Sequence, residues 1–562
     1  MIKKLIQILS KRQKASFIFI FLFMLISVMF EMLSVGMVFP VLKLLFDFNY
    51  LEKIKNYLPI IFQSIDNINL IYLILILFLV IYFLKSLIIL FIQITIARFS
   101  ADIGRDISQR LYKSYLNKDY SFYTNINSSV IIRNILTESS NIFGLIFHFN
   151  NFLIELLILI SIIIVLFLFE PTNTLFFCTI LVLVTFFYIK FNKRKIEKIA
   201  SVRSENDSLR IKKINDGVSL IKEIKIYNKI DFFLNEFSIV NFHSYESTKR
   251  LKIFQVYPRI LLEQLVIIFI VILTIILNNK GLNFSELVAT IGIYIAALLR
   301  IFPSSSRVIT SFQGFFYNLP SVYNIYDDLT ELKINKQLNV SNGKKLNFDN
   351  DIIFESLTFF YPSSKSIVLD KFKCIIRKNS INIIAGKTGS GKTTLVNLIL
   401  GLLVPKSGNI TLGGVDINQN LSSWQNSISY VPQSINLLDD TIARNIAFGT
   451  NDIDYDLLKE CINSVELNDF ISSSALGLET IVGEKGIKIS GGQAQRIAIA
   501  RALYRKPSVI VLDEATNALD NKTEELVFKT ISNLKKKMTI IIITHNINNI
   551  KFADNIISLD NK

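Results

Sequence analysis

Apolar residues follow two different patterns along this chain. Up to about residue 300 they form long stretches, and beyond that they form short runs separated by polar turns. A helix needs about 20 predominantly apolar residues to cross a bilayer, and six stretches approach that length with their flanks. Their bounds are Phe17–Leu45, Asn69–Ile96, Phe152–Phe169, Asn173–Ile189, Ile260–Leu277 and Leu287–Ile301. The pattern predicts a polytopic α-helical membrane domain followed by a soluble α/β domain.

The connections between these predicted spans alternate between short and long. The long connections are Arg98–Phe149 and Lys190–Pro258, and the second holds fifteen Lys or Arg against eight Asp or Glu. Because cytoplasmic loops collect Lys and Arg, the long connections and both termini are predicted to be cytoplasmic. Their helical periodicity predicts rods that continue beyond the bilayer, with short transverse helices near Asp119–Asn127 and Glu223–Phe237. The alternative is that these segments are solvated loops.

The N-terminus is basic and has apolar residues at helical spacing. Residues Met1–Lys14 therefore fit an amphipathic helix on the inner membrane surface. A signal peptide is the competing interpretation. It is disfavoured because the following apolar stretch is far longer than a signal sequence and lacks a small-residue cleavage site.

Composition adds few further constraints. The formal net charge is +16, which basic cytoplasmic loops explain, so no nucleic-acid partner is expected. The three cysteines are scattered, form no CxxC pair and indicate neither a zinc site nor a disulfide framework: Cys178, Cys374 and Cys461.

A phosphate-binding loop lies between a short apolar run and an apolar helix. Gly386–Thr394 fits the pattern G-x-x-x-x-G-K-[ST], after a predicted strand Ile381–Ala385 and before a predicted helix Leu395–Leu402. Backbone N–H groups of such a loop wrap phosphates, with a lysine on the β- and γ-phosphates and a hydroxyl on Mg²⁺. The predicted nucleotide-binding residues here are Gly386, Gly389, Ser390, Gly391, Lys392, Thr393 and Thr394, with Thr393 also a metal ligand.

A second motif follows a buried strand. The run from Val509 ends in two carboxylates, Asp513 and Glu514. Position favours Asp513 for the metal and Glu514 for polarising the attacking water. Taken alone, the run could also be an ordinary charged strand end.

With these motifs in order, the second half of the chain resembles the ATPase domain of ABC transporters. The signature is matched by Ser490, Gly491, Gly492 and Gln493, the glutamine loop by Gln433, the switch histidine by His545, the adenine-stacking aromatic by Tyr361, and the D-loop by Asp520. The D-loop has Asn517 where serine is usual. The resemblance implies that Glu514, His545 and Gln433 are catalytic and that Gln433 also contacts the metal.

The same resemblance implies an assembly and its cofactors. Two ATP molecules with Mg²⁺ would lie between two ATPase domains, each held by one P-loop and the partner's signature, so a homodimer is expected. The catalytic residues are present, so both sites are expected to hydrolyse ATP. The expected fold is six transmembrane helices with long cytoplasmic extensions, fused to an α/β P-loop ABC ATPase domain. The expected bounds are 1–330 for the membrane domain, 331–345 for a linker and 346–562 for the ATPase.

Three cations inside the predicted spans bear on the cargo. Lys85, Arg259 and Arg300 lie about 16 to 18 residues from the outer ends of their spans, roughly 24–27 Å deep. Charges placed there usually face a watery cavity or bind something, although they can also snorkel to the headgroups. A belt of cations would capture an anionic group, and Arg307 would extend it.

Parts of the membrane half resemble PglK-type flippases of lipid-linked oligosaccharides. The resemblance rests on Val256–Glu263, Leu299–Ser311 and Ala97–Ser100, and it implies cavity cations at Lys85, Arg259 and Arg300. It also implies an outer helix, for which Phe46–Leu58 is the candidate, with a short loop as the alternative. The expected activity is ATP-driven flipping of a polyprenyl-pyrophosphate-linked oligosaccharide across the bacterial cytoplasmic (inner) membrane. Alternatives are export of another glycolipid of lipid A type, export of drugs or peptides, and an ATP-gated channel or regulator.

Overall fold

The computed structural model describes residues 2–46, 67–169, 171–279, 284–335, 346–361, 366–387, 389–515, 521–544 and 551–559. The chain forms two compact units. One unit comprises Met1–Lys118 and Ile126–Gln337, and the other comprises Asp119–Asn125 and Leu338–Lys562. The predicted outer helix after Phe46, the D-loop with Asp520, and His545 lie outside the described residues.

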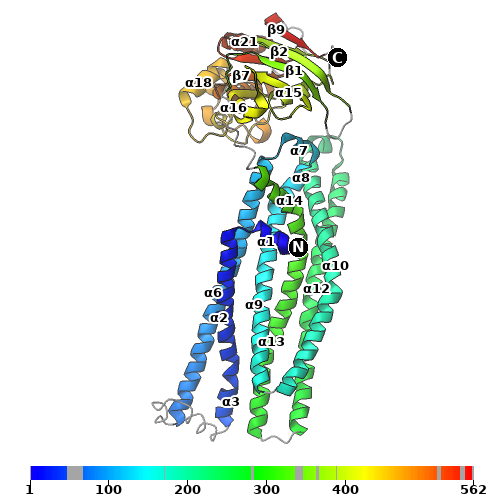
Figure 1. Cartoon of the computed structure of the whole chain (residues 1–562), viewed down its shortest axis with the longest axis vertical. Helices are drawn as coiled ribbons and strands as arrows, with labels where there is room; N and C mark the ends of the chain where they lie inside the picture. The colour runs from blue at the N-terminus through cyan, green and yellow to red at the C-terminus, as the bar shows by residue number, and fades with distance from the viewer. Residues whose placement is uncertain are drawn as a thin grey trace. The chain divides into compact units, whose positions relative to one another are not determined.

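The first unit is entirely helical in its described part (Figure 1). Its elements are α1 (Ile2–Ile8), α2 (Lys11–Gly36), α3 (Val38–Phe46), α6 (Asn67–Leu116), α8 (Ser128–Arg133), the π-helix η1 (Asn134–Glu138), α9 (Ser139–Phe169), α10 (Pro171–Ser219), α11 (Ile221–Ile226), α12 (Ile230–Asn279), α13 (Phe284–Asn318) and α14 (Pro320–Asn335). Among the described residues, five segments are long and apolar enough to cross a membrane: Lys11–Leu44, Ile68–Leu116, Ser128–Leu168, Thr174–Ser219 and Ile230–Ile276. The sixth predicted span lies in α13 and stays a prediction.

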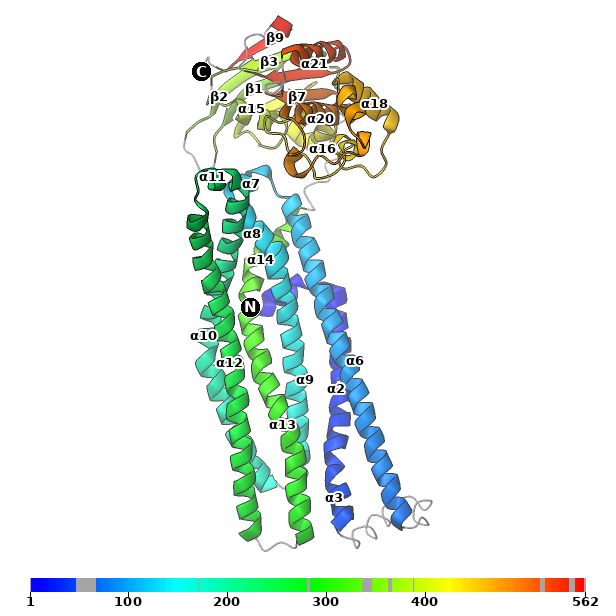
Figure 2. The ribbon, with the colours of Figure 1, turned by 180° about the vertical axis from the view of Figure 1, so that it is seen from behind.

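The long helices run continuously from the apolar stretches into the polar connections. Helices α6 and α12 each have 50 residues and α10 has 49. At 1.5 Å per residue these lengths are about 75 Å, against roughly 30 Å for the hydrocarbon core. The prediction of rods that extend beyond the bilayer is therefore confirmed. Helix α13 packs along α9, α10 packs along α12, and α2 packs on α6 and α9 (Figure 2).

Two helix boundaries differ from the predicted ones. The N-terminal helix ends at Ile8, because Ser10 caps the next helix in a reciprocal capping box with Gln13. Leu5 and Ile8 are buried, and the Ile8 carbonyl accepts a hydrogen bond from Arg110 at 2.7 Å, so α1 is packed against the helical unit. The first transverse helix is α7 (Tyr120–Asn125), as expected, but the second is α11 and ends at Ile226, well short of the predicted Phe237.

The second unit combines two sheets with helices and includes α7. An antiparallel sheet has the order β2-β1-β4-β5, and a parallel sheet has the order β6-β7-β8-β3-β9. The strands are β1 (Ile352–Phe359), β2 (Leu369–Ile376), β3 (Ile381–Ala385), β4 (Ser407–Leu412), β5 (Val415–Asp416), β6 (Ile428–Val431), β7 (Val509–Asp513), β8 (Thr539–Ile543) and β9 (Asn555–Ser558). The main helices are α15 (Lys392–Ile399), α16 (Leu421–Ser427), α17 (Ile442–Ile446), α18 (Tyr455–Ser464), α19 (Asn468–Ser473), α20 (Gly491–Tyr504) and α21 (Asn521–Leu534).

The parallel sheet separates two hydrophobic cores. Consecutive residues of a strand point to opposite faces, so Ile383 joins the core under α17, α18 and α20 while Ile384 joins the core with β1, β4 and α15. Strands buried on both faces explain the nearly continuous apolar runs in the sequence. In a parallel sheet of this kind ligands bind beyond the carboxyl ends of the strands, which is where β3, β6 and β7 deliver the predicted motifs.

Candidate functional site

The P-loop joins β3 to α15 by a tight left-handed turn. Gly389 and Gly391 have φ angles of 83° and 97°, a region that residues with a Cβ rarely adopt. A Cβ at Gly391 would also lie 3.0 Å from Val368 Cγ1. This turn lets α15 begin at Lys392, three residues earlier than the predicted start at Leu395. Lys392, Thr393 and Thr394 therefore form the first turn of the helix, whose unpaired N–H groups suit a phosphate.

The lysine of this loop is folded back onto the loop's own carbonyls. Its Nζ donates to the carbonyl oxygens of Gly386 at 2.6 Å and Lys387 at 3.0 Å. The hydroxyl of Ser390 is buried and has no hydrogen-bond partner among the described residues. A Cβ at Gly386 would come within 2.6 Å of that hydroxyl, so a larger residue there would displace the Ser390 side chain. The loop thus carries a cation, Lys392, and a hydroxyl donor, Ser390, that suit a phosphate group.

Tyr361 lies against the base of the same loop. Its hydroxyl is 3.1 Å from Thr394 Oγ1, and its ring packs edge-on against Phe359. Thr394 is buried, whereas Thr393 is exposed. Of the two threonines, only Thr393 therefore presents its side chain to the solvent side of the loop, as expected of a metal ligand.

The two carboxylates at the end of β7 differ in their surroundings. Asp513 is 8% exposed and accepts a hydrogen bond from the hydroxyl of Tyr430 at 3.2 Å. Burial raises the pKa of Asp513, while the Tyr430 hydrogen bond opposes that shift. Burial and the neighbouring Asp513 together raise the pKa of Tyr430. Tyr430 precedes Gln433 by three residues, and no sequence motif assigns it to the site.

Glu514 leaves the strand in a strained conformation. Its φ is 50°, which costs a non-glycine residue about 1–2 kcal/mol. Its N–H bonds to the Ile543 carbonyl at 3.0 Å, so the adjacent strand β8 holds the residue in this position. The side chain accepts a hydrogen bond from Gln433 Nε2 at 2.6 Å. Strain of this kind is typical of functional sites, and here it turns the carboxylate toward Gln433.

The signature residues form the start of α20. Ser490 caps the helix and accepts from the Gln493 N–H at 3.2 Å, while the Gln493 side chain accepts from the Ser490 N–H at 2.9 Å. Ser490 and Gly491 are exposed. Helix α20 has 14 residues, and its dipole favours an anion at the exposed N-terminus formed by Ser490 and Gly491.

The membrane cations are not the unpaired belt that the sequence suggested. Lys85 on α6 and Arg300 on α13 meet at one carboxylate, Glu31 on α2, which is 0% exposed. Lys85 Nζ lies 2.9 Å from Glu31 Oε1, and Arg300 places Nε and Nη2 at 2.7 and 3.3 Å from the two carboxylate oxygens. Sequence reasoning missed Glu31, although a carboxylate within a predicted span is itself a signal, because a buried charge needs a partner.

The two remaining cations lie apart from this cluster. Arg307 binds Glu155 of α9 through Nε at 2.5 Å and Nη2 at 3.2 Å. Arg259 is exposed, and no ion pair is recorded for it among the described residues. The structure therefore brings Lys85 and Arg300 together, neutralises Arg307 and leaves Arg259 open.

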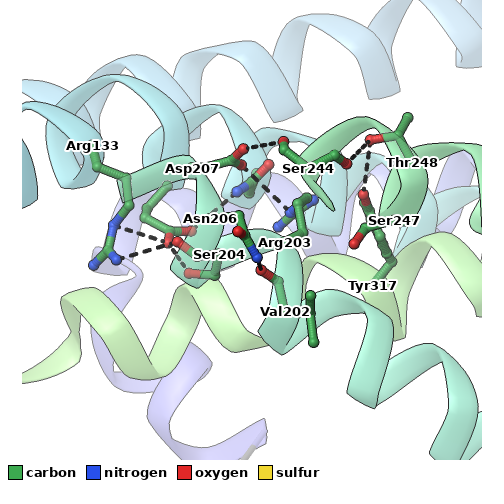
Figure 3. Close-up of polar contacts among 12 residues, drawn as sticks. Arg133, Val202, Arg203, Ser204, Asn206, Asp207, Ser244, Ser247, Thr248 and Tyr317 are labelled. Atoms are coloured by element: carbon green, nitrogen blue, oxygen red, sulfur yellow. Dashed lines mark hydrogen bonds and ion pairs between the residues drawn. The ribbon is translucent and has the colours of Figure 1, made fainter. Parts of the chain in front are cut away.

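A polar network ties together the extended parts of the helices (Figure 3). Ser204 of α10 donates to the buried Glu138 of η1 at 2.8 Å, beside Arg133. Further along α10, Asp207 accepts a hydrogen bond from Ser244 of α12 at 2.6 Å. The network links helices that are distant in sequence.

Comparisons with known proteins agree with this arrangement. Residues 17–291 match the family model described as ABC transporter transmembrane region, and residues 369–517 match the model described as ABC transporter. A protein of Rickettsia bellii with the provisional name export ATP-binding/permease protein is 30% identical over 82% of this chain and 80% of its own length. The chain belongs to the ABC transporter family. In this chain a multi-pass transmembrane region precedes an ABC-type ATPase domain, as in exporters of the family.

Other relatives of this ABC exporter differ in their named cargo. An ATP-dependent lipid A-core flippase of Blochmanniella pennsylvanica is 40% identical over 37% of this chain, and a protein of Bacillus subtilis provisionally named as a multidrug resistance ABC transporter is also 40% identical over 37%. The chain matches about a third of the length of each, 36% in both cases. The structure of a bacterial Atm1-family ABC exporter with ATP bound has a TM-score of 0.75 over 97% of this chain and 93% of its own, at 20% identity, which shows the shared fold.

Proposed function

We propose that this ABC exporter works as a homodimer that flips a polyprenyl-pyrophosphate-linked oligosaccharide from the inner to the outer leaflet of the bacterial cytoplasmic membrane. The observation that carries the cargo class is the cluster at Glu31, where two cations share one carboxylate and a net positive charge remains inside the membrane part. Arg259 adds a second, open positive charge. Charges this deep are retained where they bind something, and an anionic headgroup is their natural ligand.

In the ATPase domain the proposed roles follow from the geometry of the site. Lys392 would leave the loop carbonyls for the β- and γ-phosphates, and Ser490 of the partner subunit would cap the γ-phosphate from the other side. Glu514 would orient and polarise the attacking water. Mg²⁺, when bound, would neutralise charge on the phosphates; a hydroxyl, a carboxylate and an amide oxygen suit this hard cation, and the residues would be Thr393, Asp513 and Gln433.

A second cargo is favoured by the comparison with lipid A-core flippases. Lipid A also carries phosphate, so the same cations would serve either lipid, and only the glycan and the lipid tail would differ. A drug exporter has no need of a net positive cavity. We also propose that both termini are cytoplasmic, because the long connections between the spans are basic and cytoplasmic loops collect Lys and Arg.

The test is ATP-driven flipping of labelled lipids in proteoliposomes. Neutralising Arg300 alone would change the charge around the buried Glu31, so the informative variant combines Glu31→Gln, Lys85→Gln and Arg300→Gln, with Arg259→Ala tested separately. We expect flipping of the pyrophosphate-linked glycan to fall at least about tenfold, because guanidinium groups grip phosphate in pairs. Lys85→Arg, which keeps the charge, is the matched control. Full flipping by the neutral variant, or flipping of lipid A alone by wild type, would reject the proposed cargo.

A further inference from the structure

The ion pairs of Arg300 and Arg307 look alike but differ in what surrounds the carboxylate. Both arginines lie on α13, seven residues apart, and both use Nε and Nη2 to grip a buried carboxylate. Glu155 has Arg307 as its only cation among the ion pairs of the described residues. Glu31 has two cations, Arg300 and Lys85. Arg307 therefore cannot leave without stranding a buried charge, whereas Arg300 can.

Lys85 is built to stay with Glu31 when Arg300 leaves. Besides the 2.9 Å ion pair, its ammonium donates to Ser34 Oγ at 2.9 Å and lies 4.7 Å from the centre of the Tyr82 ring. Its side chain is 10% exposed. The lysine is thus fixed on three sides, and it would neutralise the carboxylate without help.

Arg300 is more exposed than Lys85 and is held by fewer contacts. Its side chain is 25% exposed, and its only recorded hydrogen bonds within the described part of the chain are the two to Glu31. Its Nη1 makes no recorded hydrogen bond there, so part of its five-donor fork is available to an incoming anion. An anion that binds this free edge competes directly with Glu31 for the same guanidinium.

The pair also bridges a weakly packed junction. Helix α13 packs extensively along α9, which carries Glu155, but makes few contacts with α2, which carries Glu31. The Glu155–Arg307 pair therefore lies within a closely packed helix pair. Helix α13 packs on α3, which follows α2, but its direct packing on α2 around the Glu31–Arg300 pair is slight. Breaking the Glu31–Arg300 pair would free α13 from α2 and α6 at the level of Glu31 at small cost in packing, while the packing of α13 on α3 remains.

We infer that Glu31, Lys85 and Arg300 form a cargo-operated latch: the phosphate group of the cargo draws Arg300 away from Glu31, Lys85 keeps Glu31 neutral, and α13 is released from α2 and α6. The inference rests on the proposed function for the class of cargo. It assigns Glu31 and Lys85 as positioning residues that act through Arg300, and it links cargo binding to a change in helix contacts, since a ligand shifts an equilibrium by its differential affinity for two states.

The latch predicts that changes at Glu31 and at Lys85 affect different kinetic quantities. Glu31→Gln weakens the grip on Arg300, so basal ATPase activity should rise about threefold or more and stimulation by cargo should shrink. Lys85→Gln leaves Glu31 dependent on Arg300, so the KM for stimulation by cargo should rise at least about tenfold. Lys85→Arg should restore it. Glu155→Gln is the matched control, because it removes the carboxylate of α9 that pairs with Arg307. It should lower the melting temperature without shifting the KM for stimulation by cargo.

The experiment measures ATPase activity in nanodiscs with added polyprenyl pyrophosphate, and with polyprenol as the phosphate-free control. A uniform loss of activity in Glu31→Gln and Lys85→Gln, parallel to a loss of thermal stability, would mean that the cluster is only structural and would overturn the latch. If wild type responds to neither lipid, the proposed cargo is wrong. The basal rate of Glu31→Gln still decides the latch in that case, because a basal rate at or below wild type contradicts it.

Discussion

Replacing Glu514 by glutamine tests the assignment of the water-polarising carboxylate with little change in shape. Gln433 Nε2 donates to Glu514 Oε2 at 2.6 Å, and a glutamine at position 514 still offers a carbonyl oxygen to that donor. What is lost is the negative charge. The effect on hydrolysis therefore reports the chemistry of the carboxylate and not a collapse of the site.

The expected loss of hydrolysis rate follows from the role of Glu514 as a general base. A positioned general base contributes about 10²–10⁴-fold, and each factor of ten corresponds to about 1.36 kcal/mol of activation free energy. We expect Glu514→Gln to lose about 2.7–5.4 kcal/mol of transition-state stabilisation while it continues to bind ATP. The loss should appear in kcat, with ATP affinity close to that of wild type.

The strained backbone at Glu514 supplies a second variant. Its φ of 50° costs about 1–2 kcal/mol, and glycine removes that cost while losing about 0.5–1 kcal/mol through chain entropy. Glu514→Gly should therefore be inactive yet unfold at the same temperature as wild type or slightly higher. Stability and activity would move in different directions, as expected for strain held at a functional site.

Both measurements can be made on the intact exporter. Trp424 is the single tryptophan of the chain, is fully buried in the ATPase domain and donates to the Ile399 carbonyl at 2.7 Å. Its fluorescence therefore reports the unfolding of that domain without interference. Wild-type hydrolysis by Glu514→Gln would refute the role assigned to the carboxylate, and a marked loss of stability in Glu514→Gly would refute the argument from strain.

Three further predictions follow from the described geometry. Mixing Ser490→Arg with Lys392→Ala should restore partial ATPase activity that neither variant has alone, since a dimer with one chain of each variant keeps one intact composite site; activity of a strict monomer would contradict this. Because burial raises the pKa of Asp513, the native nucleotide-free state binds more protons than the unfolded state above the carboxyl's ordinary range, and stability should fall as pH rises through that window. Asp513→Asn should flatten this pH dependence of thermal unfolding and abolish Mg²⁺-dependent hydrolysis; an unchanged profile would contradict the assignment. Glu138→Ala should destabilise the helical unit by about 3 kcal/mol, because Arg133 loses its buried partner, and Glu138→Gln should cost less; equal melting temperatures would count against the network.

The strand, turn and helix around the P-loop could be predicted because they are local in sequence. The strand β3 ends at Ala385 as predicted, and a strand, a turn and a helix start lie within one run of residues. Helix α15 begins three residues before its predicted start, because the left-handed conformation of Gly391 lets the helix start at Lys392. Tyr430 could not be assigned, since its approach to Asp513 depends on the pairing of β6 with β7, strands about 80 residues apart.

The sequence by itself determined how deep the membrane cations lie, but only the tertiary structure decided what they contact. Depth follows from counting residues along a helix, whereas pairing depends on how each helix is rotated against its neighbours. Arg300 and Glu31 are separated by 269 positions in the chain and meet at 2.7 Å. A buried carboxylate must find a cation, but with several cations at similar depth the sequence offers no means to choose between them. The packing of the helices decides the pairs: Glu31 contacts two cations, Lys85 and Arg300, and Glu155 contacts Arg307.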